Sequence, residues 1–307
     1  MKCIKCSQKA VFNSPSLCAK HFIQYFETKV FKTIKKFNLI KKDDKICVAT
    51  SGGKDSLTVL YLTKKYLETK LKQSTSKKNI QALIIDEGIG DYRSHTLEDL
   101  NLFCKQHNIF LNIISFKKEF SKSLDQLIKN KAFKHLKPCN ICGVLRRYLL
   151  NKYSKGFDKL VTGHNLDDEA QVIMMNFFRA QVELQAKLGP MTGIIKSKLF
   201  TQRIKPLYFC SEKEVMTYSI IKNFTTRFTQ CPHVTHSYRA QVRDFLNTLE
   251  LSEPGSKQNI IDNFIKILPK FKQTFKSTES VLACKLCKEP SKNPVCNACN
   301  LINLIKK

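Results

Sequence analysis

Lys45-Ile-Cys-Val-Ala-Thr-Ser-Gly-Gly-Lys-Asp-Ser-Leu57 is the stretch of sequence that decides the fold. Its apolar run from Ile46 to Ala49 predicts a buried strand, and a helical pattern begins directly after Ser51–Ser56. Two adjacent glycines can adopt backbone angles that are closed to other residues, so successive N–H groups can turn inward and cradle phosphate oxygens. The N-terminus of the following helix adds partial positive charge at the same point. The stretch therefore predicts a phosphate-binding turn.

The turn is not a Walker A loop, because G-x-x-x-x-G-K-[ST] does not occur in the sequence. A strand-to-helix turn without a ligand is the alternative interpretation. The residues Ser51-Gly-Gly-Lys-Asp-Ser56 resemble the PP-loop of the N-type ATP pyrophosphatases. That resemblance implies cleavage of ATP between its α and β phosphates, which adenylates a second substrate.

Strands and helices alternate from Lys45 onward, and the strands are nearly continuous apolar runs. This pattern predicts an α/β fold with a parallel, Rossmann-like sheet that is covered on both faces, with ligands beyond the carboxyl ends of its strands. The expected strands are 46–50, 81–86, 110–115 and 158–162, and the expected helices are 54–71, 94–107, 120–132, 143–154 and 166–180.

The expected domain organisation has four parts. An N-terminal zinc finger covers residues 1–25, and a PP-loop domain with an amphipathic lead-in helix covers 26–230. A helical segment follows at 231–280, and a C-terminal zinc ribbon occupies 281–307.

Cysteine pairs at both ends of the chain have the spacing of structural zinc sites. Each set would fill a tetrahedral shell, so neither site is expected to be catalytic, and both would stabilise segments too small for a core of their own. The expected ligands are Cys3, Cys6, Cys18 and His21 at the first site, and Cys284, Cys287, Cys296 and Cys299 at the second.

Cys139-x-x-Cys142 lies between these ends, directly before an expected helix whose positive end would favour thiolates. A lone CxxC is compatible with a redox pair, a third zinc site completed by His135 or His233, iron–sulfur ligands or a sulfur-carrying nucleophile. Cys231 is the natural third member, and three cysteines without a fourth would leave one iron of a cluster open.

The charge balance limits the choice of partners. The chain has 53 basic and 25 acidic residues and a net charge of +28, which suits a polyanion such as nucleic acid better than a membrane surface. Only eight of the basic residues are Arg, so a lysine-rich surface of no functional meaning is the alternative. No secretory signal and no apolar span of membrane length occur, which predicts a cytoplasmic location.

The assembled motifs resemble the tRNA uridine 2-thiolation enzymes, the TtuA-like family, along essentially the whole chain. The resemblance rests on both zinc modules, on Cys231-Pro232 and on five further stretches: Ser51–Ser56, Asp86-Glu-Gly-Ile-Gly90, Cys139-x2-Cys142-Gly-Val-Leu-Arg-Arg147, Gly163–Gln171 and Arg203-Ile-Lys-Pro-Leu207. It implies ATP, Mg²⁺, a [4Fe-4S] cluster and two Zn²⁺ as cofactors. It also implies tRNA and a thiocarboxylated ubiquitin-like sulfur carrier as partners, and a homodimer is common in the family.

The resemblance also implies the roles of individual residues. A [4Fe-4S] cluster would be held by Cys139, Cys142 and Cys231. The expected catalytic residues are these cysteines with Lys54, Asp55 and Asp168. The expected nucleotide-binding residues are Ala49, Thr50, Ser51, Gly52, Gly53, Asp55, Ser56, Ile85, Arg146, Gly163 and Asp168.

Residues of the expected helix 166–180 have simpler interpretations as well. Favourable interaction with the helix dipole suffices for two of the three acids Asp167, Asp168 and Glu169. The apolar face with Ile173, Met174, Phe177 and Phe178 is expected to belong to the core.

The predicted reaction is ATP-dependent tRNA 2-thiolation, with adenylation of the uridine C2 oxygen before sulfur replaces it and with uridine-54 of the T-loop favoured. The alternatives are thiolation of wobble uridine-34, thiolation of a tRNA cytidine, and a non-enzymatic zinc-ribbon RNA-binding protein.

Overall fold

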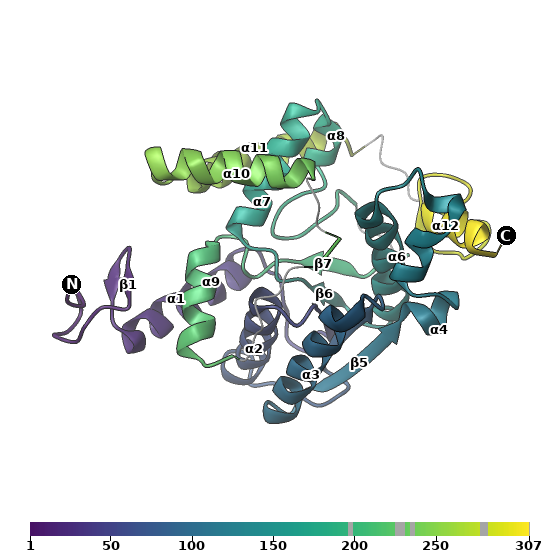
Figure 1. The fold of residues 1–307 in the computed structure, drawn as a ribbon. Helices are drawn as coiled ribbons and strands as arrows, with labels where there is room; N and C mark the ends of the chain where they lie inside the picture. Colours follow the sequence, from purple (N-terminus) through teal and green to yellow (C-terminus); the bar gives the residue numbers. More distant parts are fainter. Residues whose placement is uncertain (196–198, 225–230, 234–236, 277–281, 307) are drawn as a thin grey trace.

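A parallel sheet forms the centre of the computed structural model (Figure 1), which describes residues 1–195, 199–224, 231–233, 237–276 and 282–306. The described strands have the order β5-β4-β3-β6-β7, and every pair is parallel. Their bounds are β3 (Ile46–Thr50), β4 (Ile80–Asp86), β5 (Phe110–Ser115), β6 (Lys159–Val161) and β7 (Gln202–Ile204). The expected α/β fold is confirmed. The order runs outward in both directions from β3, so the crevice for a ligand lies at the carboxyl end of that strand.

Alternating side chains assign each helix to one face of the sheet. Ile46 and Val48 of β3 face one core, and Cys47 between them faces the other. The first face is covered by α1 (Ala19–Lys36), α2 (Lys54–Thr69), α3 (Gly90–Gln106) and α9 (Glu212–Ile221), and the second by α4 (Phe116–Phe120), α5 (Leu124–Lys129), α6 (Pro138–Tyr153) and α12 (Asn297–Lys306).

A third layer of helices lies above the carboxyl edge of the sheet in Figure 1 and has a core of its own. It consists of α7 (Leu166–Phe178), α8 (Val182–Gln185), α10 (Tyr238–Ser252) and α11 (Ser256–Thr274). Ile173 is buried in this core, as expected, but Phe177 and Phe178 are 44% and 55% exposed. Their assignment to the core was wrong, because both lie in the last turn of α7, where Phe178 meets Phe245 of α10, a side chain that is itself half exposed.

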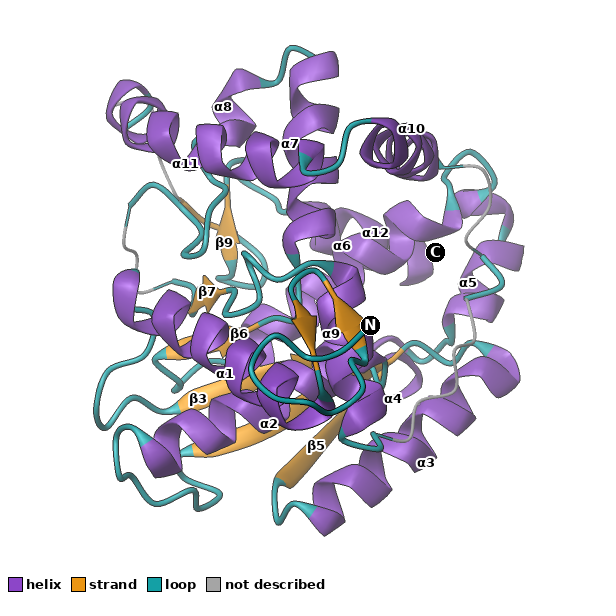
Figure 2. Ribbon diagram, turned by 90° about the vertical axis from the view of Figure 1, so that its left-hand side faces the viewer, coloured by secondary structure: helices purple, strands orange, loops and turns teal. Residues whose placement is uncertain are grey.

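The two cysteine modules lie at opposite ends of the molecule (Figure 1). The first contains the hairpin β1 (Phe12–Asn13) and β2 (Ser16–Leu17), and the second contains β8 (Leu282–Ala283) and β9 (Pro290–Ser291). Figure 2 shows the described layers from the side. The expected domain boundaries near residues 230 and 280 fall outside the described residues. None of the described helices is both long and apolar enough to cross a membrane.

Three helix predictions differ from the structure. Helix α3 begins at Gly90 rather than at residue 94. The expected helix 120–132 holds only the end of α4, followed by α5 and a 3₁₀ turn, Lys131–Phe133, because a capping box of Ser123 and Gln126 starts a new helix inside it. Helix α6 begins at Pro138 rather than at residue 143, since proline fits the first turn of a helix. Cys139 and Cys142 therefore lie inside the first turns of α6.

A buried ion pair joins the sheet to the helical layer. Lys205, just after β7, donates to both carboxylate oxygens of Glu169 on α7 at 2.8 Å, and both residues are less than a tenth exposed. Neither charge can reach water, so each depends on the other.

We expect Lys205→Ala to lower the free energy of unfolding by about 3–5 kcal/mol, because it leaves the Glu169 carboxylate buried without its partner. Urea denaturation measures this loss, and Lys205→Met with Glu169→Leu should recover most of it. Lys152→Ala is the control, since it removes a partly exposed partner of Glu119 and should cost no more than about 1 kcal/mol. Equal losses in the two single variants would contradict the assignment of a buried pair.

Candidate active site

The turn between β3 and α2 has the geometry of a phosphate cradle. Gly52 has φ +84°, and a Cβ there would lie 2.7 Å from the carbonyl oxygen of Thr96. The hydroxyl of Ser56 accepts from the Ser51 amide at 3.2 Å and donates to the Gly53 carbonyl at 2.9 Å. The loop is therefore closed on itself at the N-terminus of α2, where the amide groups of the first turn are concentrated.

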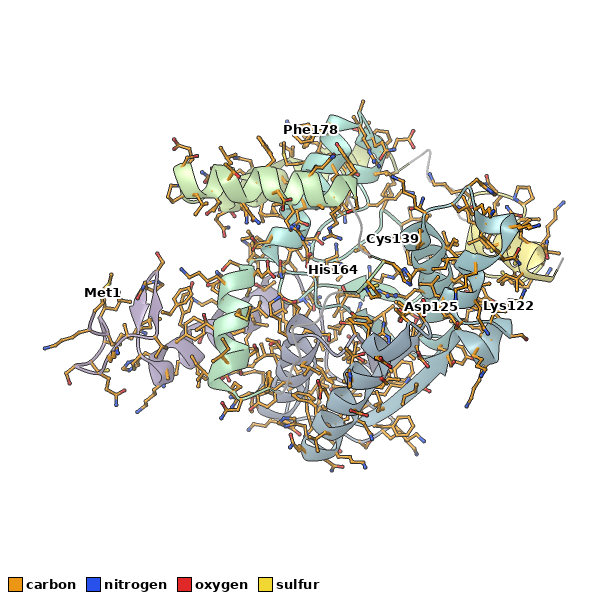
Figure 3. The ribbon with its side chains drawn as sticks, in the orientation of Figure 1. Met1, Lys122, Asp125, Cys139, His164 and Phe178 are labelled. Atoms are coloured by element: carbon orange, nitrogen blue, oxygen red, sulfur yellow. The ribbon has the colours of Figure 1, made fainter. Side chains whose placement is uncertain are left out.

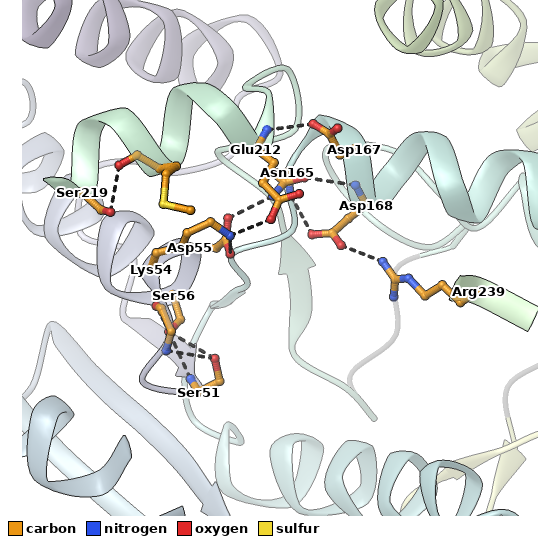
Figure 4. Close-up of polar contacts among 12 residues, drawn as sticks. Ser51, Lys54, Asp55, Ser56, Asn165, Asp167, Asp168, Glu212, Ser219 and Arg239 are labelled. Atoms are coloured by element: carbon orange, nitrogen blue, oxygen red, sulfur yellow. Dashed lines mark hydrogen bonds and ion pairs between the residues drawn. The ribbon is translucent and has the colours of Figure 1, made fainter. Parts of the chain in front are cut away.

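Lys54 lies directly beside this turn and joins two acids (Figure 4). Its ammonium donates to Asp55 at 3.0 Å and to Glu212, the first residue of α9, at 2.9 Å. The lysine is thus held at the phosphate turn by carboxylates from two helices, which keeps its charge close to any anion bound there.

Asp55 and Asp168 lie close together on the first turns of α2 and α7 (Figure 4). Asn165 connects them, because its side-chain amide donates to Asp55 at 2.9 Å and its carbonyl oxygen accepts from the Asp168 amide at 3.0 Å. Arg239 from α10 donates to Asp168 at 2.7 Å. Burial raises the pKa of both carboxyl groups, and the Asp168 charge adds to the rise at Asp55. Two carboxylates that repel each other suit a divalent cation.

The turn after β6 presses against the phosphate loop. A Cβ at Gly163 would lie 2.9 Å from the backbone carbonyl of Asp55, so only glycine allows this approach. The two acids beside Asp168 bind buried lysines instead, Asp167 to Lys257 at 2.6 Å and Glu169 to Lys205. Asp168 is the acid of the three that faces Asp55.

Glu87 is fully buried at the carboxyl end of β4 and pairs with two arginines, Arg93 and Arg146. Arg93 also donates to the Ser51 carbonyl of the phosphate turn at 3.2 Å. Arg146 lies on α6 with a guanidinium nitrogen 3.5 Å from the sulfur of Cys142. One carboxylate therefore ties the phosphate turn to the cysteine-bearing helix.

Glu87, Arg93 and Arg239 were not predicted from the sequence to have a role in the site. Glu87 did carry a signal, because it follows a strand at the edge where ligands bind. Arg93 and Arg239 contact residues that are distant in sequence, and no local sequence pattern predicts such contacts.

The three central cysteines come together on the same side of the sheet. Cys142 and Cys231 pack against one core, and their charges interact. Cys139 is exposed, and its thiol donates to the carbonyl of His233, two residues after Cys231, at 3.5 Å. Figure 3 shows Cys139 and His164 on the side of the sheet that faces α10.

The spacing of these sulfurs differs from that of the terminal cysteines. Among the described residues, Cys139, Cys142 and Cys231 do not form a group within 4.8 Å, whereas both terminal quartets do. The three sulfurs are therefore not arranged around a single ion as the terminal quartets are. The ring nitrogen Nε2 of His233 contacts Asp125 at 2.7 Å, and His135 is exposed. The third zinc site that either histidine would complete therefore has no support.

The expected activation of these thiols by the helix end is wrong for Cys142. Burial raises the pKa of Cys142 to about 11, and the nearby Glu87 and Cys231 add to the rise while Arg146 opposes it. A free Cys142 thiol is therefore protonated at neutral pH. A sulfur-carrying nucleophile and a metal ligand both need a thiolate, so either use of this side chain requires a neighbouring cation or a bound metal that stabilises the deprotonated form.

The terminal quartets have the dimensions of tetrahedral zinc sites. Zinc–sulfur bonds of about 2.3 Å place two sulfurs about 3.8 Å apart. The observed separations are 3.7 Å between Cys6 and Cys18, 3.8 Å between Cys284 and Cys299, and 3.6 Å between Cys287 and Cys296.

At the first quartet the ring nitrogen Nδ1 of His21 lies 3.4–3.5 Å from the sulfurs of Cys3, Cys6 and Cys18. This identifies Nδ1 as the atom that faces a metal. Both donor sets fit zinc.

The remaining sequence-predicted nucleotide residues line or support the same edge. Ala49 and Ile85 lie on the α6 face of β3 and β4, and Thr50 uses its hydroxyl to donate to the Leu83 carbonyl. Cys47 and Cys104 are buried among apolar side chains, and burial raises the pKa of each thiol to about 12.

Comparison with known proteins agrees with this geometry. Residues 24–247 match the family model described as a PP-loop domain. The chain is 33% identical to the tRNA-5-methyluridine(54) 2-sulfurtransferase of Pyrococcus horikoshii, covering 100% of this chain and 95% of the relative. It is 30% identical to the tRNA 2-thiolation protein NcsA of Haloferax volcanii, covering 100% of this chain and 99% of that protein.

One solved structure is similar over nearly the whole chain. It is the U34-tRNA thiolase NcsA of Methanococcus maripaludis with its [4Fe-4S] cluster, with a TM-score of 0.78 and 30% identity. The similarity covers 98% of this chain and 95% of that protein.

The two glycines of the phosphate turn should respond differently to alanine. Gly52→Ala combines a positive φ with a backbone clash and should cost more than about 1–2 kcal/mol of stability. Gly53 has φ −84°, and a Cβ there would meet only the Ser51 hydroxyl at 3.6 Å, so Gly53→Ala should be neutral or slightly stabilising. Thermal denaturation with and without ATP measures both effects, and equal destabilisation would contradict the turn geometry.

Proposed function

The chain belongs to the PP-loop family of tRNA 2-thiolation enzymes, and from that premise we propose that it replaces the C2 oxygen of a tRNA uridine with sulfur at the expense of ATP. The observation that carries the proposal is the Arg93–Glu87–Arg146 contact. It joins a phosphate-binding turn to a group of three cysteines, which is the pairing of sites that activation followed by sulfur transfer requires.

The first half-reaction takes place at the phosphate turn. The uridine C2 oxygen attacks the α-phosphate of ATP, pyrophosphate leaves, and the base carries an adenylate in place of a poor leaving group. The amides of Gly52 and Gly53, the hydroxyls of Ser51 and Ser56, and the Lys54 ammonium counter the negative charge that develops. Lys54 is already aimed at this turn by Asp55 and Glu212, which supports its role.

Asp55 and Asp168 fit a Mg²⁺ site. Their carboxyl groups repel each other, and Mg²⁺ prefers carboxylate oxygens together with phosphate oxygens. Asn165 and Arg239 fix the two carboxylates from the other side, so both are held in place before the nucleotide binds.

The second half-reaction takes place at the cysteines. Cys139, Cys142 and Cys231 would hold a [4Fe-4S] cluster, which would supply a binding site for sulfide beside the activated base. Sulfur attack at C2 expels AMP and leaves 2-thiouridine. Arg146 lies between the two half-sites, where its guanidinium neutralises charge on the thiolate side and on a phosphate.

The proposal also covers the terminal metal sites, the source of sulfur, the oligomeric state and the location of the protein. The terminal quartets would bind one Zn²⁺ each and stabilise the ends of the chain. A thiocarboxylated ubiquitin-like carrier is the proposed source of sulfur, and the active protein is a homodimer in the cytoplasm. A relative from Laccaria bicolor, 32% identical, is a cytoplasmic tRNA 2-thiolation protein, which supports this location.

Variants of the two half-sites should fail at different steps. Cys139→Ala, Cys142→Ala and Cys231→Ala should each abolish thiolation of tRNA while tRNA-dependent release of pyrophosphate continues. Asp55→Asn should reduce pyrophosphate release at least a hundredfold, because it removes a carboxylate beside Lys54. Anaerobic assays with sulfide measure both products. Cys104→Ala is the matched control, and normal thiolation by the variants of the three central cysteines would contradict the mechanism.

The position of the target uridine is the finer part of the proposal. We propose uridine-54 of the T-loop, supported by the relative from Pyrococcus horikoshii. The second candidate is wobble uridine-34, which the structural similarity to the Methanococcus maripaludis thiolase favours. Nuclease digestion and mass spectrometry of tRNA from a deletion strain should show loss of 2-thiouridine at position 54. Loss only at position 34 would transfer the assignment to the anticodon.

A further inference from the structure

Helix α6 has a second polar face that the proposed chemistry does not use. Cys139, Cys142 and Arg146 are spaced by three and four residues and face Glu87 and the sulfur site. Val144, Arg147, Tyr148 and Asn151 have the same helical spacing but share another face. This second face points toward the C-terminal zinc ribbon.

A cavity of about 610 Å³ lies between this face of α6, residues 187–195 and 200–203, and the ribbon. Arg203 reaches it from β7. The register of the sheet pairs Arg203 with Leu160, which faces the α6 side, so the guanidinium is directed to the same side. Lys292 of the ribbon lines the opposite wall. Cationic side chains from three separate parts of the chain therefore line the cavity.

No carboxylate neutralises the two arginines among the residues that the structure describes. Glu289, which also lines the cavity, is committed to Asn151 and Lys155 and so fastens the ribbon to α6. Burial and the charge of Arg147 lower the pKa of Arg203. Two guanidinium groups held together without an acid lower the stability of the free protein, and an anion would relieve that cost.

Arginine is scarce in this chain, and five of its eight arginines lie at the two half-sites or at this cavity. The sequence has eight arginines among 53 basic residues. Arg93 and Arg146 bind Glu87, Arg239 binds Asp168, and Arg147 and Arg203 share the cavity. A lysine-rich surface explains the net charge of the chain. It does not explain why arginine, whose planar guanidinium can make two parallel hydrogen bonds, occupies these positions.

We propose that this cavity is a phosphodiester-binding subsite, in which Arg147 and Arg203 bind a backbone phosphate of the RNA substrate. The inference rests on the proposed function and extends it to a named contact. A guanidinium group can donate two parallel hydrogen bonds to two oxygens of one phosphate. Side chains of the ribbon would add polar contacts at the rim of the cavity.

The position of the cavity suits an RNA strand that enters the sulfur site. Cys142 and Arg147 are five residues apart on α6, which is about 7.5 Å along the helix axis. The Arg147 side chain also runs back toward the cysteines, because a Cβ at Gly143 would lie 3.3 Å from one of its guanidinium nitrogens. A phosphate held by Arg147 would thus lie near the cysteine end of α6. An acidic protein partner would need carboxylate contacts with no such relation to the reacting base.

The test compares two variants that lose the same charge. Arg147→Gln with Arg203→Gln should weaken tRNA binding at least about tenfold at moderate salt and reduce the slope of log Kd against log salt by about 1–2. Lys41→Gln with Lys42→Gln removes two exposed charges before β3 that do not line the cavity, and should leave both quantities close to wild type. Fluorescence anisotropy with labelled tRNA measures them.

Three further measurements decide the outcome. Titration with ATP should give the wild-type Kd in both variants, which separates an RNA phosphate from a nucleotide phosphate. The melting temperature of the arginine variant should equal or exceed that of wild type, because a repulsion is removed. Arg147→Lys with Arg203→Lys should bind tRNA with intermediate affinity, since the charge remains and the paired geometry is lost.

The arginine variant overturns the proposal if it binds tRNA as tightly as the lysine control, or if it loses ATP binding instead. Loss of binding only to a protein sulfur donor would also overturn it and would assign the cavity to that partner. Failure of the wild-type protein to bind or thiolate tRNA would refute the proposed function, which is a different result from equal behaviour of the two variants.

Discussion

The buried carboxylate of Glu87 is the constraint on which the active site depends. A charge that cannot reach water needs partners in fixed positions, and Glu87 has two, Arg93 and Arg146. Arg93 continues to the carbonyl of Ser51, and Arg146 continues to the sulfur of Cys142. The separation between the nucleotide turn and the sulfur site is therefore set by hydrogen-bonded charges in the protein interior. A reaction with two successive steps on one base needs such a fixed separation.

Local patterns were sufficient to predict the sheet and the metal ligands. The strands 46–50 and 110–115 have the expected bounds, because apolar runs between turn residues have few other solutions. The zinc quartets are equally local, since each ligand set is fixed by short spacings within a small module. The start of α6 was missed because cysteine, asparagine and glycine are weak helix formers, and Pro138 outweighs them only as a first-turn residue.

The residues of the site could be predicted from the sequence, but the hydrogen bonds and ion pairs between them could not. Asp55, Asp168 and the three cysteines could be named, whereas Arg239 reaches Asp168 across 71 positions and Lys54 reaches Glu212 across 158. Such contacts form when separate layers of the fold pack against each other, and the spacing of apolar residues along the sequence does not predict them. The acidity of Cys142 was misjudged for the same reason. The helix end is a local feature, but the burial that governs the thiol is produced by the whole fold.

The two polar atoms of the Asn165 side-chain amide make separate hydrogen bonds. The carbonyl oxygen caps α7, and the NH₂ group binds Asp55. Aspartate has almost the same shape and caps helices equally well, but it has no hydrogen to offer. Spontaneous loss of ammonia from this one side chain would thus leave α7 intact and set a new negative charge against Asp55. Because Asn165 is buried, that charge would also lower the free energy of unfolding, so a change at a single atom would disturb the site and the stability of the fold together.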